Sequence, residues 1–464
     1  MCLLLRDVVP RATGILLFME TKMKDLEYKN LEYKRWLDKA SVIKSYAHFD
    51  KRVSLRTIIS KIKNPEYISR YAFKPFIHYP LTFKKYSKGE RKEKTRELYY
   101  SSHQDRCVYQ YYSHIIDQKY IDRVNKDGIN DVAIAYRTDL HQSNIDFAKT
   151  AFDFIRSYQK CIIMVGDFTN FFDTLQHSYL KSRLCDLLGV ETLSEDFYKV
   201  FKSITKFSFV NLSDILKYYK MDDTFENRRT LNKKDVIMPI QELRKRKALI
   251  HTNNDNYGIP QGSAISAILS NVYMLEFDKK IHEYCSKNNA LYLRYSDDSI
   301  FIFPVDTKDE FTIHYDTIMK TIKSIPNLQL QKEKTKLYYY SDETVENIDS
   351  FIGNGENGKN IIDYLGFSFD GKKVHIRDKT VSKYYYRAYK KADTIAEMQG
   401  ITPKGNIISE ERLYKVYTNK GAKDKPGNFL TYVNRCVSAF GENEGVSRIA
   451  KVHYGKIKKR KRYK

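Results

Sequence analysis

The chain has 464 residues and a formal net charge of +24, with 81 Lys and Arg against 57 Asp and Glu. This length predicts two or three subdomains instead of a single core, and the excess of cations predicts a polyanionic partner. The six cysteines are scattered without the spacing of a metal site, which favours a reducing compartment, here the cytoplasm. No apolar run approaches the length of a membrane span, so no membrane partner is expected.

Charged, helix-like sequence occupies the N-terminal part of the chain, and we expect residues 1–66 to form a helical extension. Met1, Met19 and Met23 are alternative start positions. Further along, a helix is predicted near residues 144–158, because apolar residues recur on one of its faces. These residues are Ile145, Ala148, Phe152 and Ile155.

The middle of the chain contains a buried strand and then a charged segment. The uninterrupted apolar run Cys161–Val165 is typical of a strand that is buried on both faces. Asp167 follows this run after Gly166, at the end of a strand where sheets commonly place a functional side chain. Residues 211–255 are polar and rich in charge, including Arg228-Arg229. That segment either returns to the part of the fold before the strand or contacts RNA, and both interpretations are open.

A glycine-containing turn, Tyr257–Ser263, leads into a predicted helix with Ser263 as its expected N-cap. Apolar residues recur at helical spacing after it: Ile265, Ile268, Leu269, Val272 and Leu275. Such a turn lets the backbone approach a ligand closely, next to the partial positive charge of a helix start. Taken alone, the pattern is more typical of an ordinary connection between a loop and a helix.

Two adjacent carboxylates, Asp297 and Asp298, lie between the apolar segments 291–293 and 299–303, which predicts a hairpin with the acidic pair at its tip. Like charges side by side are unfavourable unless a cation neutralises them, and Mg²⁺ is the usual cation. An isolated acidic turn more often just faces water. Together with Asp167, however, the pair could hold two metal ions about 4 Å apart, an arrangement that catalyses phosphoryl transfer.

In this order, the three segments resemble the palm motifs of reverse transcriptases. The resemblance covers residues 166–173, 258–271 and 293–303. Residues 94–98, with Asp105-Arg106, are similar to the fingers signature of these enzymes. Residues 330–335 are similar to the segment after the palm hairpin, and residues 364–367 are similar to the primer grip. The resemblance implies an α+β right-hand polymerase with fingers, a palm whose antiparallel sheet is flanked by helices, and a helical thumb. The implied ranges are 67–159 for the fingers, 160–210 and 256–370 for the palm, 211–255 for the charged insertion, 371–446 for the thumb and 447–464 for a basic tail.

The resemblance also implies roles for single residues. Asp167, Asp297 and Asp298 are the expected catalytic residues, and with the backbone carbonyl of Phe168 they would bind two Mg²⁺ ions, for which Mn²⁺ is a possible substitute. Phe172 matches the bulky residue that excludes a ribose 2′-hydroxyl. The other expected nucleotide-binding residues are Lys94, Arg96, Gln261, Gly262 and Lys334, and the expected primer grip is Leu365, Gly366 and Phe367.

Within this family, residues 259–271 resemble bacterial enzymes, and residues 134–139 and 364–386 resemble the defence-associated and abortive-infection lineage. A retron-type reverse transcriptase is an alternative. Retron enzymes would carry a Val-Thr-Gly triplet, which this chain lacks, and Ile145 breaks the retron pattern that Asn144 would begin.

The implied function is an RNA-directed DNA polymerase, a nucleotidyltransferase that copies a structured non-coding RNA partner into DNA from deoxynucleoside triphosphates, in antiphage defence. Alternatives at the same site are protein-primed or template-independent DNA synthesis, an RNA-dependent RNA polymerase, which Phe172 disfavours, and a scaffold that has lost catalysis. The basic run at 451–464 is either a disordered solubilising tail or an RNA-binding segment. Most of the 38 tyrosines are expected in sheets and cores. The sequence does not determine the oligomeric state, and a homo-oligomer is possible.

Overall fold

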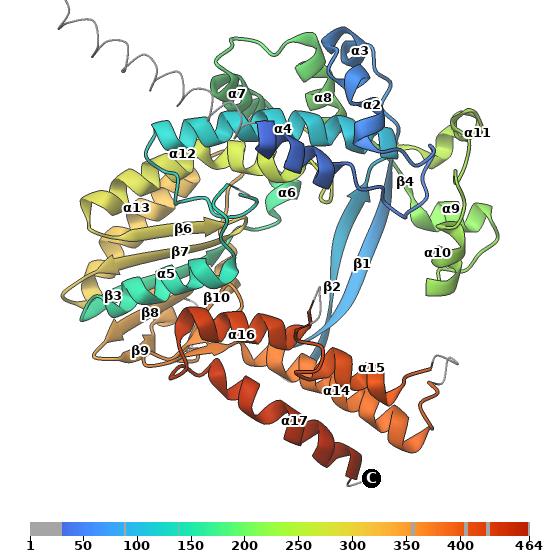
Figure 1. The fold of residues 1–464 in the computed structure, drawn as a ribbon. Coiled ribbons are helices and arrows are strands. Elements are labelled where there is room, and N and C mark those ends of the chain that lie inside the picture. The colour runs from blue at the N-terminus through green and yellow to red at the C-terminus, as the bar shows by residue number, and fades with distance from the viewer. Residues whose placement is uncertain are drawn as a thin grey trace, which may run out of the picture. The chain divides into compact units, whose positions relative to one another are not determined.

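A computed structural model describes residues 30–87, 90–137, 139–353, 358–402, 407–423 and 427–462 (Figure 1). The chain divides into two compact units, each built from two stretches of sequence. The first unit contains Met1–Arg123 and Phe172–Tyr273, and the second contains Val124–Phe171 and Met274–Lys464. Part of the expected N-terminal extension, residues 1–29, lies outside the described residues.

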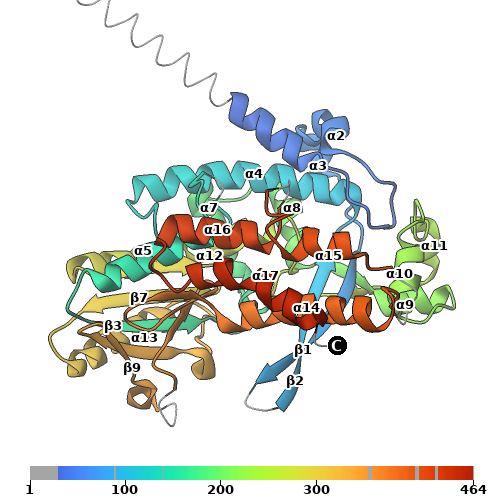
Figure 2. The same ribbon diagram turned by 60° about the horizontal axis from the view of Figure 1, so that its bottom comes forward.

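The first unit is built around a four-stranded sheet with the order β2-β1-β4-β5. Its strands are β1 (Phe76–Ser87), β2 (Glu90–Tyr100), β4 (Ser208–Asn211) and β5 (His251–Thr252). The first two strands pair antiparallel along their whole length and form a long two-stranded arm, clearly visible in Figure 2. The helices are a stretch at 30–40, α2 (Leu55–Ile62), α3 (Pro65–Ser69), the start of α4 (His103–Lys126), α6 (Phe171–Thr174), α7 (His177–Leu188), α8 (Glu195–Thr205) and the start of α12 (Ser266–Lys287).

The charged segment 211–255 belongs to the first unit. It forms the helices α9 (Leu212–Tyr218), α10 (Phe225–Leu231) and α11 (Ile240–Lys245), with a 3-10 turn at Lys247–Leu249. Strand β4, whose last residue Asn211 begins the segment, pairs in parallel with β1. Apolar residues of this strand and of the segment share one small core with residues near the N-terminus. That core includes Ala47, Phe49, Ile77, Val210, Ile215 and Leu243. The segment therefore packs against residues near the N-terminus within the first unit, and its assignment as a return to the fingers stays a prediction.

The second unit contains a five-stranded antiparallel sheet with the order β6-β7-β3-β8-β9 (Figure 1). Its strands are β3 (Lys160–Asp167), β6 (Leu291–Tyr295), β7 (Asp298–Pro304), β8 (Lys336–Ser341) and β9 (Thr344–Asn347). Strand β3 is central and almost entirely buried, as its continuous apolar sequence predicts. Tyr338, Tyr339 and Tyr340 are buried in β8, which agrees with the expectation that most tyrosines are sheet or core residues.

Alternation along the strands gives this sheet two apolar faces. Ile163, Ile300 and Ile302 face a core that also contains Ala148 and Phe152 of α5 (Asn144–Arg156). This helix occupies the predicted range, and its predicted apolar residues are buried. On the other face, rings of the sheet contact rings of α12 and of α13 (Phe311–Lys323), including Tyr292 with Phe277 and Phe303 with His314. Short 3-10 turns occupy Lys308–Glu310, Lys332–Lys334 and Asp349–Ile352.

A small three-stranded sheet and four helices complete the second unit. The strands are β10 (Ile362–Tyr364), β11 (Phe367–Phe369) and β12 (Val374–Ile376), and the helices are α14 (Asp378–Glu397), α15 (Glu410–Tyr417), α16 (Phe429–Phe440) and α17 (Ser447–Arg462). Helices α14 and α16 both contact α17, and α15 contacts both α14 and α16, so the four form one bundle (Figure 2).

The C-terminal basic run does not form a disordered tail over the described residues. Residues 447–462 form α17, in which Ile457 is fully buried. Arg460 forms a two-point ion pair with Asp393 of α14, at 3.0 and 3.2 Å, and Lys456 lies over the ring of Tyr385. The sequence pattern did not predict this helix because lysines dominate the run and leave few apolar residues to mark a buried face.

No helix among the described residues has the length and the apolar character needed to cross a bilayer. The cysteines in the described part of the chain are all buried and unpaired.

Candidate active site

The predicted acidic hairpin forms, with its two carboxylates in different positions. Tyr295 pairs with Asp298 across β6 and β7, which leaves Ser296 and Asp297 as the two central residues of the turn. Ser296 has a φ of 61°, the left-handed conformation that the first central residue of a tight II′ hairpin turn requires. Asp297 therefore lies at the tip, and Asp298 is the first residue of β7.

A buried ion pair anchors this turn. The guanidinium of Arg294, with no exposed surface, donates to both carboxylate oxygens of Asp278 on α12, at 2.9 and 2.6 Å. Its remaining Nη1 donates to the carbonyl of Ser296 at 3.1 Å. The forked geometry of arginine thereby links the turn to a helix behind the sheet. Sequence reasoning missed this pair; the signal was a single arginine inside an otherwise apolar strand.

Asp167 lies beside the hairpin because β3 pairs with β7. The register places Asp167 opposite Asp298. The amide of Phe168 donates to the carbonyl of Asp297 at 3.0 Å, which joins the end of β3 to the turn. Gly166 allows the segment after the hairpin to pack closely on β3, since a Cβ there would stand 2.8 Å from a methyl carbon of Leu330. The tertiary structure thus brings the three predicted carboxylates into one neighbourhood.

The pKa values of Asp297 and Asp298 are both raised. The side chain of Asp298 remains accessible, yet the surrounding protein removes part of its water and, with the charges of Asp297 and Asp167, raises its pKa to about 6. The pKa of Asp297 is also raised, first by burial and then by the charge of Asp167, partly offset by a backbone hydrogen bond. Such mutual repulsion is what a bound cation would relieve.

A cation of the chain already lies at this site. Lys334, at the end of a 3-10 turn, places its Nζ 2.7 Å from Oδ1 of Asp167. Among the described residues, no three Asp, Glu, His or Cys side chains are already arranged to hold a metal ion. The charges of the three carboxylates fit a divalent cation, and the ammonium group of Lys334 neutralises part of them.

We expect Mg²⁺ and protons to compete at Asp298. Because its folded-state pKa lies above that of an unfolded aspartate, protonation stabilises the metal-free fold, and this stabilisation is lost as the pH rises through about 6. Mg²⁺ should consequently raise the Tm by roughly 3 °C at pH 7.5 and have little effect at pH 5. Thermal unfolding with Mg²⁺ or EDTA at both pH values measures this, and Asp298→Asn should reduce the pH dependence of the effect, leaving the part that Asp297 contributes. An equal Mg²⁺ effect at the two pH values would contradict it.

The predicted primer grip is a tight hairpin between β10 and β11. Tyr364 pairs with Phe367, and the two residues between them have positive φ, 45° at Leu365 and 94° at Gly366. Glycine adopts this conformation freely, but leucine does so at a cost of about 1 kcal/mol or more. Asn144, the first residue of α5, donates through Nδ2 to the Leu365 carbonyl at 3.0 Å and to the hydroxyl of Tyr432 at 3.1 Å. The sequence pattern around Asn144 did not predict this contact.

Asn144→Ala is expected to loosen this turn, because the strained Leu365 loses the bond to its carbonyl. If the turn positions the primer, kcat/KM for the primer should fall about tenfold, as expected when one partly buried hydrogen bond is removed. Adding Leu365→Gly, which removes the strain, should restore most of the loss. Steady-state primer extension on both variants tests this. Further loss in the double variant would show that Asn144 does not act through the turn.

The remaining predicted nucleotide-binding residues belong to the first unit. The carbonyl of Gln261 accepts from the Tyr99 amide at 2.8 Å, and a Cβ on Gly262 would stand 2.8 Å from the Tyr99 carbonyl, so this turn lies directly against β2. Lys94 and Arg96 are exposed on the same strand. Phe172 is half-buried, and its carbonyl accepts from the Ile259 amide at 2.9 Å. The structure therefore joins the turn at 259–262 to both β2 and Phe172.

One local prediction is wrong. Helix α12 begins at Ser266, not directly after Ser263, and the buried hydroxyl of Ser263 has no hydrogen-bond partner within the described residues. The Ser266 hydroxyl instead donates to the carbonyl of Pro260 at 2.7 Å. The close packing of Gly262 against β2 keeps Ser263 outside the helix. The predicted apolar positions of the helix are nevertheless buried.

Comparison with known proteins identifies the family. The family described as "Reverse transcriptase (RNA-dependent DNA polymerase)" matches residues 113–369, which is 257 of the 464 residues. Similar solved structures include apo telomerase from Candida tropicalis truncated from its C-terminal domain, with 14% identity, a TM-score of 0.40, and coverage of 65% of this chain and 55% of that one. Full apo telomerase from Candida tropicalis has 12% identity, a TM-score of 0.41, and coverage of 91% and 68%.

Telomerase from Candida albicans in complex with a fragment of telomeric RNA has 13% identity, a TM-score of 0.38, and coverage of 87% and 59%. This chain thus spans little more than half the length of the first of these proteins. The family assignment rests on the match over 113–369, which contains Asp167, Asp297, Asp298 and the sheet that joins them. The chain belongs to the reverse transcriptase family.

Proposed function

We propose that this protein is an RNA-directed DNA polymerase that works by two-metal nucleotidyl transfer. The observation that supports it best is the pairing of β3 with β7, which places Asp167 opposite Asp298 and next to the turn of Asp297. Such a set of carboxylates on a rigid sheet suits catalysis that depends on positioning and charge neutralisation. Membership of the reverse transcriptase family supports the same activity.

In this proposal Asp167, Asp297, Asp298 and the carbonyl of Phe168 hold two Mg²⁺ ions, with Mn²⁺ as a possible substitute. When bound, the ions activate the primer 3′-hydroxyl and neutralise the developing charge on the phosphates. Lys334, which contacts Asp167, is the proposed donor of a proton to the leaving pyrophosphate. The other proposed contacts are Lys94 and Arg96 to the triphosphate, Gln261 and Gly262 to the new base pair, Phe172 to the deoxyribose, and Leu365, Gly366 and Phe367 to the primer.

The positions of Lys94 and Arg96 on β2 support their proposed role in binding the triphosphate. Lys94 and Arg96 lie two residues apart on β2, so both side chains project from one face of the strand. The guanidinium of Arg96 lies 5.7 Å from the ring centroid of Phe83 on β1, which limits its freedom and leaves its donors for a phosphate. A lysine and an arginine on one exposed face suit a triphosphate, which carries several charges.

A finer proposal concerns the biological role. We infer that the protein copies a structured non-coding RNA partner into DNA as part of antiphage defence. The support is the resemblance of residues 134–139 and 364–386 to the defence-associated lineage, and the net charge of +24, which suits binding to an RNA.

Two assays test the proposal. Purified protein with a primed RNA template, Mg²⁺ and deoxynucleoside triphosphates should yield DNA complementary to the template; absence of templated incorporation with either Mg²⁺ or Mn²⁺ would refute the activity. Purification from the native host, followed by sequencing of the nucleic acids that co-purify, should yield one discrete RNA with complementary DNA. A random mixture of cellular RNAs would refute a dedicated RNA partner and leave the polymerase activity standing.

A further inference from the structure

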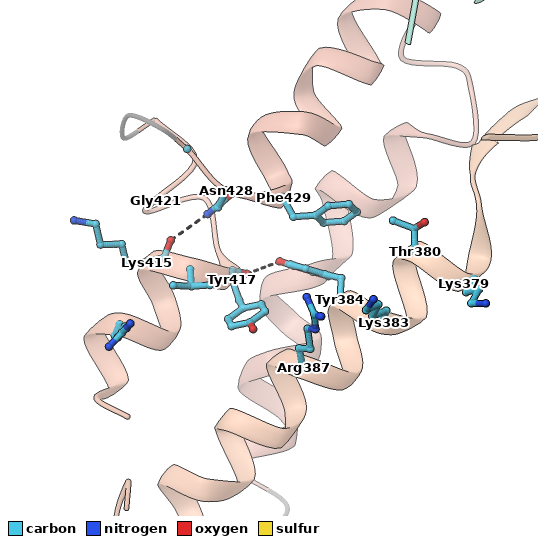
Figure 3. A pocket seen from close by; sticks show the side chains of 13 residues that line it. Lys379, Thr380, Lys383, Tyr384, Arg387, Lys415, Tyr417, Gly421, Asn428 and Phe429 are labelled. Atoms are coloured by element: carbon cyan, nitrogen blue, oxygen red, sulfur yellow. Dashed lines mark hydrogen bonds between the residues drawn. The ribbon is translucent and has the colours of Figure 1, made fainter. Parts of the chain in front are cut away.

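A large pocket lies between α14, α15 and the start of α16, all within the second unit (Figure 3). Its volume is about 1060 Å³, slightly above the usual range for sites that bind small organic molecules. It contains none of the proposed catalytic residues. The pocket therefore offers a binding site of its own.

A row of cations borders this pocket. Lys379, Lys383 and Arg387 are spaced four residues apart on α14, so they form a row with steps of about 6 Å along one helical face. Arg412 of α15 faces the same pocket. None of the lining residues is acidic, and these four side chains form no ion pair with other described residues. A polyanion is the ligand that such a row would attract.

The nearby Lys391 shows that this positive charge is not compensated locally. Burial lowers the pKa of Lys391, and the charges of Arg412 and Arg387 lower it further. Lys391 continues the cationic surface into an adjoining hollow that it shares with Arg387, Lys390 and Tyr417. The cationic surface thus extends beyond the pocket, as a strand of linked phosphates would require.

Aromatic rings form the other wall. Figure 3 shows the rings of Tyr384, Tyr417 and Phe429 between Lys415 on one side and Lys383 on the other. Phe429, the first residue of α16, is only half-buried, and its ring centroid lies 4.6 Å from that of Tyr384. The Tyr384 hydroxyl donates to the carbonyl of Tyr417 at 2.7 Å, which fixes this wall.

The rim is held in place before any ligand binds. Asn428 caps α16 by accepting from the Leu430 amide at 2.8 Å, and its Nδ2 donates to the carbonyls of Thr418 and Lys415 at 2.8 and 3.1 Å. One side chain thereby joins the start of α16 to the end of α15 (Figure 3). Preformed sites lose less conformational entropy on binding.

A concave site with cations at its edge and an aromatic wall inside suits an unpaired nucleotide better than a duplex. A duplex keeps its bases stacked within and presents phosphates on a convex surface, whereas an unpaired nucleotide can turn its base inward. We propose that this pocket binds an unpaired nucleotide of a single-stranded RNA segment, with its phosphates on Lys383 and Arg387 and its base against Phe429. This deepens the proposed function, because it names the site and the strand state through which the RNA partner is held.

The test compares two labelled probes by fluorescence anisotropy: a single-stranded RNA oligonucleotide and the same sequence fully paired. The double variant Lys383→Ala, Arg387→Ala should weaken single-strand binding about tenfold or more and paired RNA less than threefold. Its plot of log K against log salt for the single strand should be shallower by roughly 0.7 for each phosphate that the variant no longer neutralises. Phe429→Leu should weaken single-strand binding about fivefold without changing that slope.

Lys323→Ala is the matched control, because Lys323 is an exposed lysine of the same unit at the end of α13, away from the pocket. It should leave both affinities unchanged. Equal losses for the two probes, or an equal loss in the control, would overturn the proposal, since the cations would then act only through general charge. Displacement of the single strand by excess dATP from the unaltered protein, but not from the double variant, would also overturn it in favour of a free-nucleotide site. The polymerase assay is independent of these outcomes, so either proposal can fail while the other stands.

Discussion

Asp297→Asn and Asp167→Asn should each reduce deoxynucleotide incorporation by about a thousandfold or more, with little change in the Tm. Asn keeps the size of Asp but removes the charge that would neutralise a divalent cation. In Asp297→Asn the backbone of the turn should persist, because Arg294 holds the neighbouring Ser296 carbonyl and not the Asp297 side chain. Removing a carboxylate relieves repulsion within the group. Asp167→Asn also removes the ion pair with Lys334, a small cost because both side chains are partly exposed. Single-turnover primer extension measures the loss, and thermal unfolding verifies the fold.

Asp316→Asn is the matched control, because Asp316 is an exposed aspartate on α13 in the same unit. It should retain full activity. Full activity in both Asp297→Asn and Asp167→Asn would remove the two-metal mechanism. A large fall in the Tm of either variant would instead assign that carboxylate a structural role.

Phe172→Ala should raise the incorporation of ribonucleotides relative to deoxynucleotides by about a hundredfold. A bulky ring beside the sugar discriminates by collision with the 2′-hydroxyl, so truncation removes discrimination against ribose and leaves the chemistry intact. The substitution should be tolerated, because the ring is only half-buried and the contact with Ile259 is made by the backbone carbonyl. The measurement is the ratio of kcat/KM for matched ribo- and deoxyribonucleoside triphosphates.

Phe225→Ala serves as the control for loss of a phenylalanine, because its side chain is 73% exposed in the first unit. It should leave the sugar preference unchanged. If Phe172→Ala also leaves the ratio unchanged, the residue that selects the sugar lies elsewhere. If the unaltered protein already accepts ribonucleotides equally well, RNA synthesis becomes the better description of the activity.

Several elements could be predicted from the sequence because their signals are local. The apolar run at 161–165 predicted β3, and the two apolar segments around Asp297 predicted the hairpin of β6 and β7. Helical spacing predicted α5 with its buried face. A local signal fails where tertiary packing overrides it. Ser263 is a good capping residue, but its neighbour Gly262 packs against β2 and α12 begins only at Ser266.

Contacts between segments that lie far apart in the chain could not be predicted from the sequence. Periodicity says that Asp167 ends one strand and Asp298 begins another, but not that these strands are neighbours or which residues face each other. The same holds for the bond between Asn144 and Leu365, and for the partner of Arg294. Each of these contacts joins parts of the chain that lie far apart in sequence, and local propensity carries no information about such contacts.

The amino-acid sequence by itself determined the chemical groups: three carboxylates next to apolar strands, a bulky ring after the first of them, and a surplus of positive charge. Only the tertiary structure decided how they are used, by aligning β3 with β7, by placing Lys334 on Asp167, and by gathering the cations of α14 around an aromatic wall. The physical reason is that hydrophobic patterning sets which face of each element is buried, whereas register and ion pairing are settled when those faces pack together.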